Sequence, residues 1–131
     1  MECIIITIFP EMVQSVLSTS LLKRAGERGL LKASVVNLRD FTEDKHLSSD
    51  DSPYGGGAGM VLKPDPIFRA VDALGKGGDP LRLILLSPQG RCFDQEMALS
   101  LSRETRKIVF LCGRYEGVDE RVRELYVDRE I

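Results

Sequence analysis

The sequence contains few of the residues that build metal and disulfide frameworks. Histidine occurs once, as His46, which excludes a metal site built from several histidines. Tryptophan is absent, and the three cysteines, Cys3, Cys92 and Cys112, are odd in number and show no CxxC spacing. These cysteines fit reduced thiols in a cytoplasmic protein, not a disulfide or zinc framework.

Long apolar runs and an excess of one charge are also absent. The longest apolar runs, such as residues 3–6, are far too short to span a membrane, and no pattern of a secretory signal is visible. Lysine and arginine number 18 and aspartate and glutamate 20, so the net charge is −2. This balance argues against non-specific binding of nucleic acid by bulk charge, but it is compatible with a local basic patch.

Short apolar runs alternate with helical patterns along the 131 residues, a length typical of one domain. The apolar runs predict strands at residues 3–8, 30–38, 81–86 and 108–112. Such alternation is typical of an α/β fold, and we expect a mainly parallel sheet with flanking helices.

Four helices are expected, the first from Pro10 to Gly26 or Gly29 and the others beginning near residues 65, 94 and 119. Asp94 is expected to cap the third, and Asp119 and Glu120 to begin the fourth. The residues expected on the inner faces are, in order, Val13, Val16, Leu17 and Leu21; Ile67, Ala70, Val71 and Leu74; Met97, Ala98 and Leu101; and Val122 and Leu125.

A long polar stretch, residues 39–59, ends in a cluster of glycines, and the segment 52–60 reads SPYGGGAGM. Glycine loses more backbone entropy on folding than any other residue, so a cluster is costly unless the chain needs positive φ or a close approach. A loop of this length in a compact domain is usually functional or disordered. The cluster is therefore either a flexible turn or a loop laid against a ligand.

Two expected strands end in loops of similar design, LLSPQGR at residues 85–91 and CGRYEG at residues 112–117. In parallel sheets, ligands bind beyond the carboxyl ends of the strands. Either loop alone reads as an ordinary turn, but both together with the glycine cluster favour a binding site. Arg114 and Glu116 either form a surface ion pair or belong to that site, and their position favours the site. The dinucleotide fingerprint GxGxxG and the P-loop are both absent.

The segments SPYGGGAGM, LSPQGR and CGRYEGVDERV, with TIFPEM at residues 7–12 and NLRDFTEDKH at residues 37–46, resemble a known family. The resemblance is to the bacterial tRNA (guanine-N1)-methyltransferases, of the trefoil-knotted SPOUT class, and it runs along essentially the whole chain. It implies transfer of a methyl group from S-adenosyl-L-methionine to N1 of the guanosine that is 3′-adjacent to the anticodon (guanosine-37). It also implies a cytoplasmic homodimer whose partner is tRNA and which does not associate with a membrane.

The resemblance also assigns site residues. Those implied to bind the cofactor are Leu85, Leu86, Ser87, Pro88, Gly90, Gly113, Tyr115, Glu116 and Gly117. Those implied to contact tRNA are Arg39, His46, Asp50, Tyr54, Gly55, Gly56, Gly57 and Gly59, with Lys45 and Arg114 as further basic contacts. Arg114 and Glu116 are expected to support catalysis, and Glu116 to help hold a magnesium ion.

The family continues past position 131 with a knot-closing segment, an aspartate proposed as the general base and a C-terminal tRNA-binding domain. We therefore expect residues 1–131 to be the S-adenosylmethionine-binding SPOUT domain, truncated before the knot closes and inactive alone. The alternative, from another class, is a non-catalytic RNA- or nucleotide-binding module on the same sheet.

Overall fold

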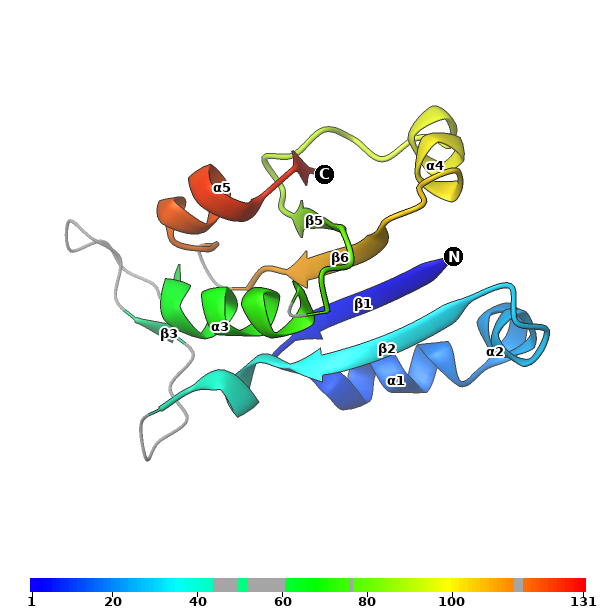
Figure 1. Ribbon diagram of the computed structural model, residues 1–131, viewed down its shortest axis with the longest axis horizontal. Helices are drawn as coiled ribbons and strands as arrows, with labels where there is room; N and C mark the ends of the chain where they lie inside the picture. Colours follow the sequence, from blue (N-terminus) through cyan, green and yellow to red (C-terminus); the bar gives the residue numbers. More distant parts are fainter. Residues whose placement is uncertain (44–49, 52–60, 76, 115–116) are drawn as a thin grey trace.

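The structure of the protein, a computed structural model, describes residues 1–43, 50–51, 61–75, 77–114 and 117–131 (Figure 1). Of residues 50 and 51 it describes the backbone only. The elements in chain order are β1 (Glu2–Thr7), α1 (Pro10–Leu17), α2 (Ser20–Glu27), β2 (Lys32–Asn37), the 3-10 helix η1 (Leu38–Phe41), β3 (Asp50–Asp51), β4 (Val61–Leu62), α3 (Pro64–Gly75), β5 (Leu81–Leu86), α4 (Gln95–Ser102), β6 (Lys107–Cys112), α5 (Glu120–Tyr126) and β7 (Arg129–Glu130).

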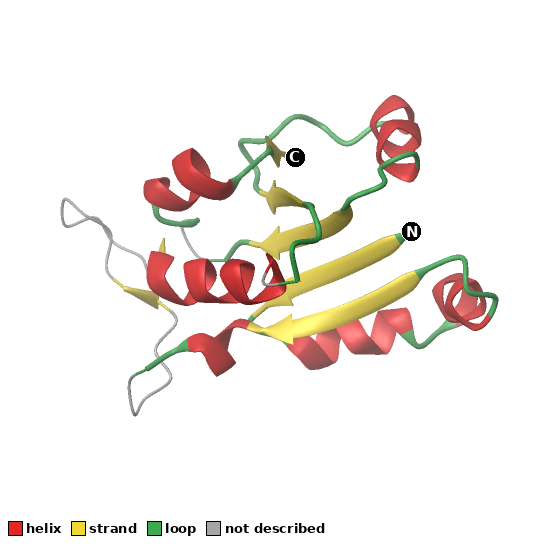
Figure 2. Cartoon of the chain, viewed as in Figure 1, coloured by secondary structure: helices red, strands yellow, loops and turns green. Residues whose placement is uncertain are grey.

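Within the described residues, β2, β1, β6, β5 and β7 form a five-stranded sheet in that order, and every pairing in it is parallel (Figure 2). The four strands expected from the sequence are confirmed, and so is the parallel α/β architecture. β3 and β4 form a separate antiparallel pair. The short β7 was not expected, because Arg129 and Glu130 carry no apolar pattern.

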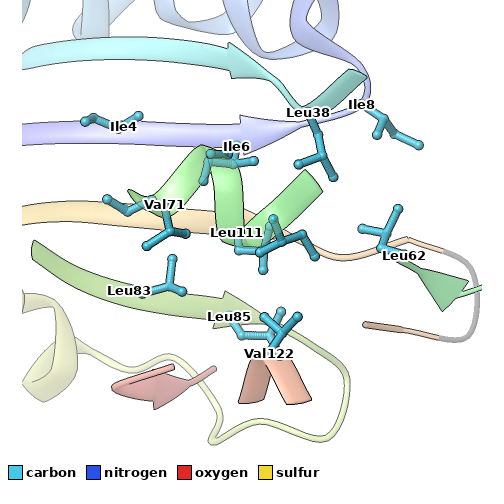
Figure 3. Packing of buried hydrophobic residues seen from close by; sticks show 13 residues of the cluster. Ile4, Ile6, Ile8, Leu38, Leu62, Val71, Leu83, Leu85, Leu111 and Val122 are labelled. Atoms are coloured by element: carbon cyan, nitrogen blue, oxygen red, sulfur yellow. The ribbon is translucent and has the colours of Figure 1, made fainter. Parts of the chain in front are cut away.

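Helices cover both faces of this sheet, which explains why β1, β5 and β6 read as nearly continuous apolar runs. The larger core cluster joins one face to α3 and α5, and ten of its buried residues are labelled in Figure 3. Ile4, Ile6, Leu83 and Leu111 point into it. A smaller cluster on the other face brings Ile84 and Ile108 against Met97 and Leu101 of α4.

The expectation of one helix from Pro10 to Gly26 is wrong, because the chain forms α1 and α2 with a break at Ser18 and Thr19. The hydroxyls of Ser18 and Thr19 donate to carbonyls three residues back, which favours a turn over a continuous helix. Ser20 then has a φ of 48°. The expected apolar face is not buried as one surface, since the side chains of Val16 in α1 and Leu21 in α2 are exposed.

The remaining helices begin close to their expected positions. Asp94 caps α4, since its side chain accepts from the backbone nitrogen of Met97 at 2.8 Å, and Asp119 caps α5 in the same way through Arg121. In α5 the expected inward face is half wrong. Val122 is fully buried, whereas Leu125 is 68% exposed, because the helix turns Val122 and Tyr126, four residues apart, toward the core.

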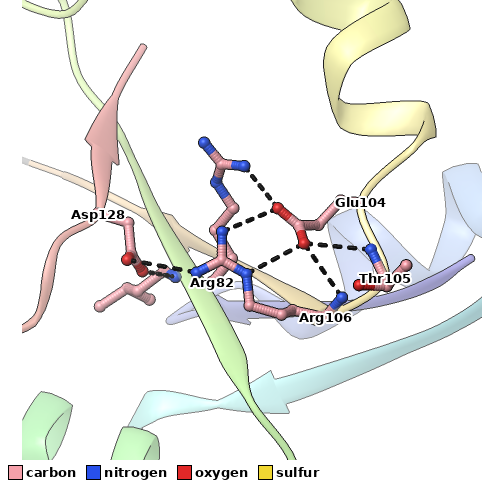
Figure 4. A network of polar contacts seen from close by, with 6 residues as sticks. Arg82, Glu104, Thr105, Arg106 and Asp128 are labelled. Atoms are coloured by element: carbon pink, nitrogen blue, oxygen red, sulfur yellow. Dashed lines mark hydrogen bonds and ion pairs between the residues drawn. The ribbon is translucent and has the colours of Figure 1, made fainter.

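A network of charges ties the amino ends of β5, β6 and β7 together (Figure 4). Glu104, whose side chain is 9% exposed, accepts from Arg82 at 2.5 Å and from two nitrogens of Arg106 at 2.9 and 3.0 Å. Hydrogen bonds from Arg106 and then Arg82 hold the pKa of Glu104 well below its usual range. The Asp128 carboxylate accepts from the backbone nitrogen of Leu83 at 2.7 Å, so the chain before β7 is fixed to β5.

Candidate functional site

The loops that follow β5 and β6 lie side by side at the carboxyl edge of the sheet, because Leu86 and Cys112 are paired in register. In the described part of the chain these loops border a cavity of about 590 Å³, which α5 and β7 complete. Its lining residues are Leu85, Leu86, Ser87, Pro88, Gln89, Gly113, Arg114, Gly117, Val118, Glu120, Arg123 and Glu130. The cavity thus occupies the position expected of a ligand site in a parallel sheet.

Most of the described residues that the resemblance assigns to a cofactor site meet at this cavity. They are Leu85, Leu86, Ser87, Pro88, Gly113 and Gly117, and Arg114 lies beside them. A Cβ at Gly113 would lie 3.1 Å from the carbonyl oxygen of Leu86, so the two loops approach each other closely there. Gly117 has a φ of 123°, which L side chains rarely adopt. The two glycines therefore shape the cavity through the backbone.

Gly90, also assigned to the cofactor, is not among the residues that line this cavity. A Cβ at residue 90 would instead lie 2.5 Å from the backbone of Ile131. Hydrogen bonds hold the two segments together, from the backbone nitrogen of Ser87 to the oxygen of Ile131 at 2.8 Å and from that of Arg91 to the oxygen of Glu130 at 3.1 Å. The structure thus gives Gly90 a packing role, and its contact with a cofactor stays a prediction.

A charged group on the cavity wall was missed by sequence reasoning. The Glu130 carboxylate accepts from the hydroxyl of Ser87 and from the guanidinium of Arg123, and these hydrogen bonds, that of Ser87 first, lower the pKa of Glu130. Arg123 also donates to Glu120 at 3.2 Å. The sequence could have predicted the ion pair of Glu120 and Arg123, because residues three positions apart on a helix are neighbours. No sequence pattern indicated the position of Glu130, because that position depends on the pairing of β7 with β5.

Two arginines that the resemblance assigns to tRNA contacts lie against one aromatic ring. The guanidinium carbon of Arg114 lies 4.5 Å from the ring centroid of Phe9, and that of Arg39 lies 5.7 Å from it. Both distances are within the range of cation–π attraction. Phe9 was not predicted as a site residue, although it belongs to the segment TIFPEM. The contacts of Phe9 with the two arginines depend on the tertiary structure, which brings the ends of β1 and β6 and the helix η1 together.

Several predicted residues lie outside the described part of the chain, namely Lys45, His46, Tyr54, Gly55, Gly56, Gly57, Gly59, Tyr115 and Glu116. Asp50 is described through its backbone, which pairs with Leu62 in the β3–β4 ladder. Among the described residues, no group of three or more histidine, cysteine, aspartate or glutamate side chains could hold a metal ion. None of the helices in these residues is long and apolar enough to cross a membrane. Cys3, Cys92 and Cys112 are free thiols.

The fold and the cavity define an α/β domain with a cavity at the carboxyl ends of neighbouring parallel strands, the place where ligands bind in folds of this class. The family model of "tRNA (Guanine-1)-methyltransferase TrmD" matches residues 1–131. The chain therefore belongs to the tRNA (guanine-1)-methyltransferase family, and the SPOUT-type fold expected from the resemblance is confirmed.

Individual relatives agree with this assignment. The chain is 50% identical over 131 residues to a tRNA (guanine-N(1)-)-methyltransferase of Carboxydothermus hydrogenoformans, matching 100% of this chain and 51% of the relative. It is 54% identical over 127 residues to that of Dictyoglomus turgidum, matching 97% of this chain and 50% of the relative. The crystal structure of the tRNA (m1G37) methyltransferase from Aquifex aeolicus superposes with a TM-score of 0.91 at 36% identity, over 100% of this chain and 58% of that chain. The chain spans about half the length of the curated relatives it matches.

Proposed function

We propose that the intact protein transfers a methyl group from S-adenosylmethionine to N1 of the guanosine 3′-adjacent to the anticodon in tRNA. The observation that carries the proposal is the cavity between the loops after β5 and β6, because most of the described residues that the resemblance assigns to this cofactor line it. The relatives' names, which state methylation of guanine N1 in tRNA and, for the solved structure, m1G37, support it.

The residues at the cavity fit S-adenosylmethionine. A volume of about 590 Å³ lies within the range of about 300–1,000 Å³ that small-molecule sites occupy. Leu86, Pro88 and Val118 offer apolar surface to a flat purine ring, and the carboxylates of Glu120 and Glu130 on the same wall are paired with Arg123. When bound, S-adenosylmethionine supplies an electrophilic methyl group on a positively charged sulfur.

Guanine N1 must lose its proton when it attacks a methyl carbon, so a general base is required. Glu130 is a poor candidate, because its lowered pKa makes it a weak base and its hydrogen bonds to Ser87 and Arg123 already occupy the carboxylate. Its role is to hold the loop after β5, α5 and β7 together at the cavity wall. We propose that the base is an aspartate in the part of the protein that corresponds to the remaining half of the relatives.

Methyl transfer tests the function directly. The intact protein is incubated with methyl-labelled S-adenosylmethionine and a tRNA transcript that carries guanosine 3′ of the anticodon. Label should appear in the tRNA as 1-methylguanosine, and a transcript with adenosine at that position should stay unlabelled. Calorimetry with S-adenosylmethionine alone is run in parallel. Binding of the cofactor or the tRNA without any transfer would favour the alternative, a non-catalytic RNA- or nucleotide-binding module.

The proposal extends to the assembly and to the metal. We propose a cytoplasmic homodimer, to be measured by analytical ultracentrifugation, and a magnesium ion held with the help of Glu116. Omitting magnesium, with a chelator present, should reduce methyl transfer and leave S-adenosylmethionine binding in place. Unchanged transfer would remove the metal from the proposal.

A further inference from the structure

Phe9 is the point at which three segments far apart in the sequence meet. It follows β1, while Arg39 lies in η1 and Arg114 follows β6. Both guanidinium groups lie over the ring of Phe9, at 4.5 Å for Arg114 and 5.7 Å for Arg39. Arg114 is also part of the cavity wall, so the ring connects this wall to η1.

The ring is fixed independently of the two arginines. Phe9 packs against the larger core cluster, and its backbone nitrogen donates to the buried Thr7 hydroxyl oxygen at 3.1 Å. The following Pro10 further restricts the backbone of Phe9. Arg39 is held in place as well, because its guanidinium donates to the carbonyl oxygen of Ile8.

A fixed ring limits the positions that a long arginine side chain can take, because a cation is attracted to the ring face. Arginine matches the oxygens of a phosphate group in geometry as well as in charge.

We propose that Phe9 is a positioning residue, which holds the guanidinium of Arg114 at the rim of the cavity, where it receives a backbone phosphate of the tRNA. This inference rests on the proposed function, since tRNA is the substrate that brings the phosphate. It assigns Phe9 a role in tRNA affinity and none in cofactor affinity.

Steady-state kinetics of the intact protein test this role. Phe9→Leu should raise the KM for tRNA about two- to fivefold, the loss that removing one cation–π contact predicts. It should leave the dissociation constant of S-adenosylmethionine unchanged and flatten the dependence of the tRNA KM on salt. Phe9→Tyr keeps the ring and should restore the wild-type KM. Phe9→Met is a second variant without a ring, in case Phe9→Leu folds poorly.

The matched control is Phe110→Leu. Phe110 is a partly buried phenylalanine that packs against the smaller core cluster on the other face of the sheet. It reproduces the loss of an aromatic ring from the core away from the two arginines. If Phe110→Leu raised the tRNA KM as much as Phe9→Leu, or if Phe9→Tyr failed to restore it, the positioning role would be wrong.

A second readout does not depend on catalysis. Protons held over a ring face are shielded, so the side-chain signals of Arg114 in the NMR spectrum should lie upfield and should move downfield in Phe9→Leu. Arg114→Lys removes these signals and thereby assigns them. Signals that stay in place in Phe9→Leu would overturn the inference. If the wild-type protein methylates no tRNA, the proposed function fails, and this measurement still decides whether Phe9 positions Arg114.

Discussion

Gly90 lies directly against the backbone of Ile131, and a Cβ at residue 90 would be 2.5 Å from both the amide nitrogen and the carbonyl carbon of Ile131. Real Cβ atoms do not approach backbone this closely, so any side chain at position 90 must displace one of the two segments. The loop after β5 and the segment around β7 are also joined by hydrogen bonds between Ser87 and Ile131 and between Arg91 and Glu130. The cavity wall therefore depends on this contact, although Gly90 does not line the cavity.

Gly90→Ala should consequently lower both the stability of the protein and its affinity for S-adenosylmethionine. A forced backbone shift of this kind costs about 1–3 kcal/mol. Thermal unfolding and calorimetry measure the two effects. Gly26→Ala is the control, because a Cβ there would meet its nearest neighbour, the oxygen of Leu31, at an ordinary 3.8 Å. A Gly90→Ala protein with wild-type melting temperature and affinity would show that the contact with Ile131 is unimportant.

Glu130 and Arg123 should act as a coupled pair in cofactor binding. Glu130→Gln keeps a side chain that can bond to Ser87 but removes the charge that Arg123 faces, so S-adenosylmethionine should bind roughly tenfold more weakly. Arg123→Met should have a similar effect, and the double variant should be little worse than either single one. Calorimetry on all three variants gives the coupling. Fully additive losses would mean that the two residues act independently.

The charge network around Glu104 should make the stability of the protein depend on pH. The pKa of Glu104 is lowered in the folded protein from its ordinary value of 4.5, so its contribution is complete above that value and is lost progressively as the pH falls below it. Urea unfolding followed from pH 7 into the acid range should show this loss. In Glu104→Gln, stability at pH 7 should be lower and its decline in acid shallower.

The control for Glu104 is Asp79→Asn. Asp79 pairs with Lys107 at 2.6 Å, but its side chain is 57% exposed, and exposed pairs contribute little. This variant should therefore unfold almost like the wild type at pH 7. An acid decline that is equally steep in wild type and in Glu104→Gln would show that other carboxylates dominate the pH dependence.

The sequence predicted those parts of the molecule that local pattern determines. The apolar runs 81–86 and 108–112, each followed by a small residue and a glycine loop, predicted two strands, and the structure confirms that these strands end side by side at one cavity, because parallel strands bring their carboxyl ends to one edge. The break between α1 and α2 was missed, because the hydroxyl hydrogen bonds of Ser18 and Thr19 compete with an otherwise helical pattern. Glu130 and Phe9 were missed for another reason. Their roles arise from tertiary contacts, the pairing of β7 with β5 and the meeting of three chain segments, which leave no periodicity in the sequence.

Gly113 should be the position at which cofactor affinity is lost with the smallest loss of stability. A Cβ there would lie 3.1 Å from the carbonyl oxygen of Leu86, so alanine requires a shift of only a few tenths of an ångström, whereas valine adds two methyl groups at the cavity wall. S-adenosylmethionine affinity should therefore fall slightly in Gly113→Ala and by roughly tenfold or more in Gly113→Val, a loss of about 1.4 kcal/mol or more of binding free energy. Calorimetry and thermal unfolding on both variants measure the affinity and the stability. Gly75→Ala is the control, because a Cβ at residue 75 would meet only the side chain of Leu81, at an ordinary 3.6 Å. Loss of affinity with little change in melting temperature would separate Gly113 from Gly90, where both should fall. Unchanged affinity in Gly113→Val would show that the cavity between the loops after β5 and β6 is not where the cofactor binds.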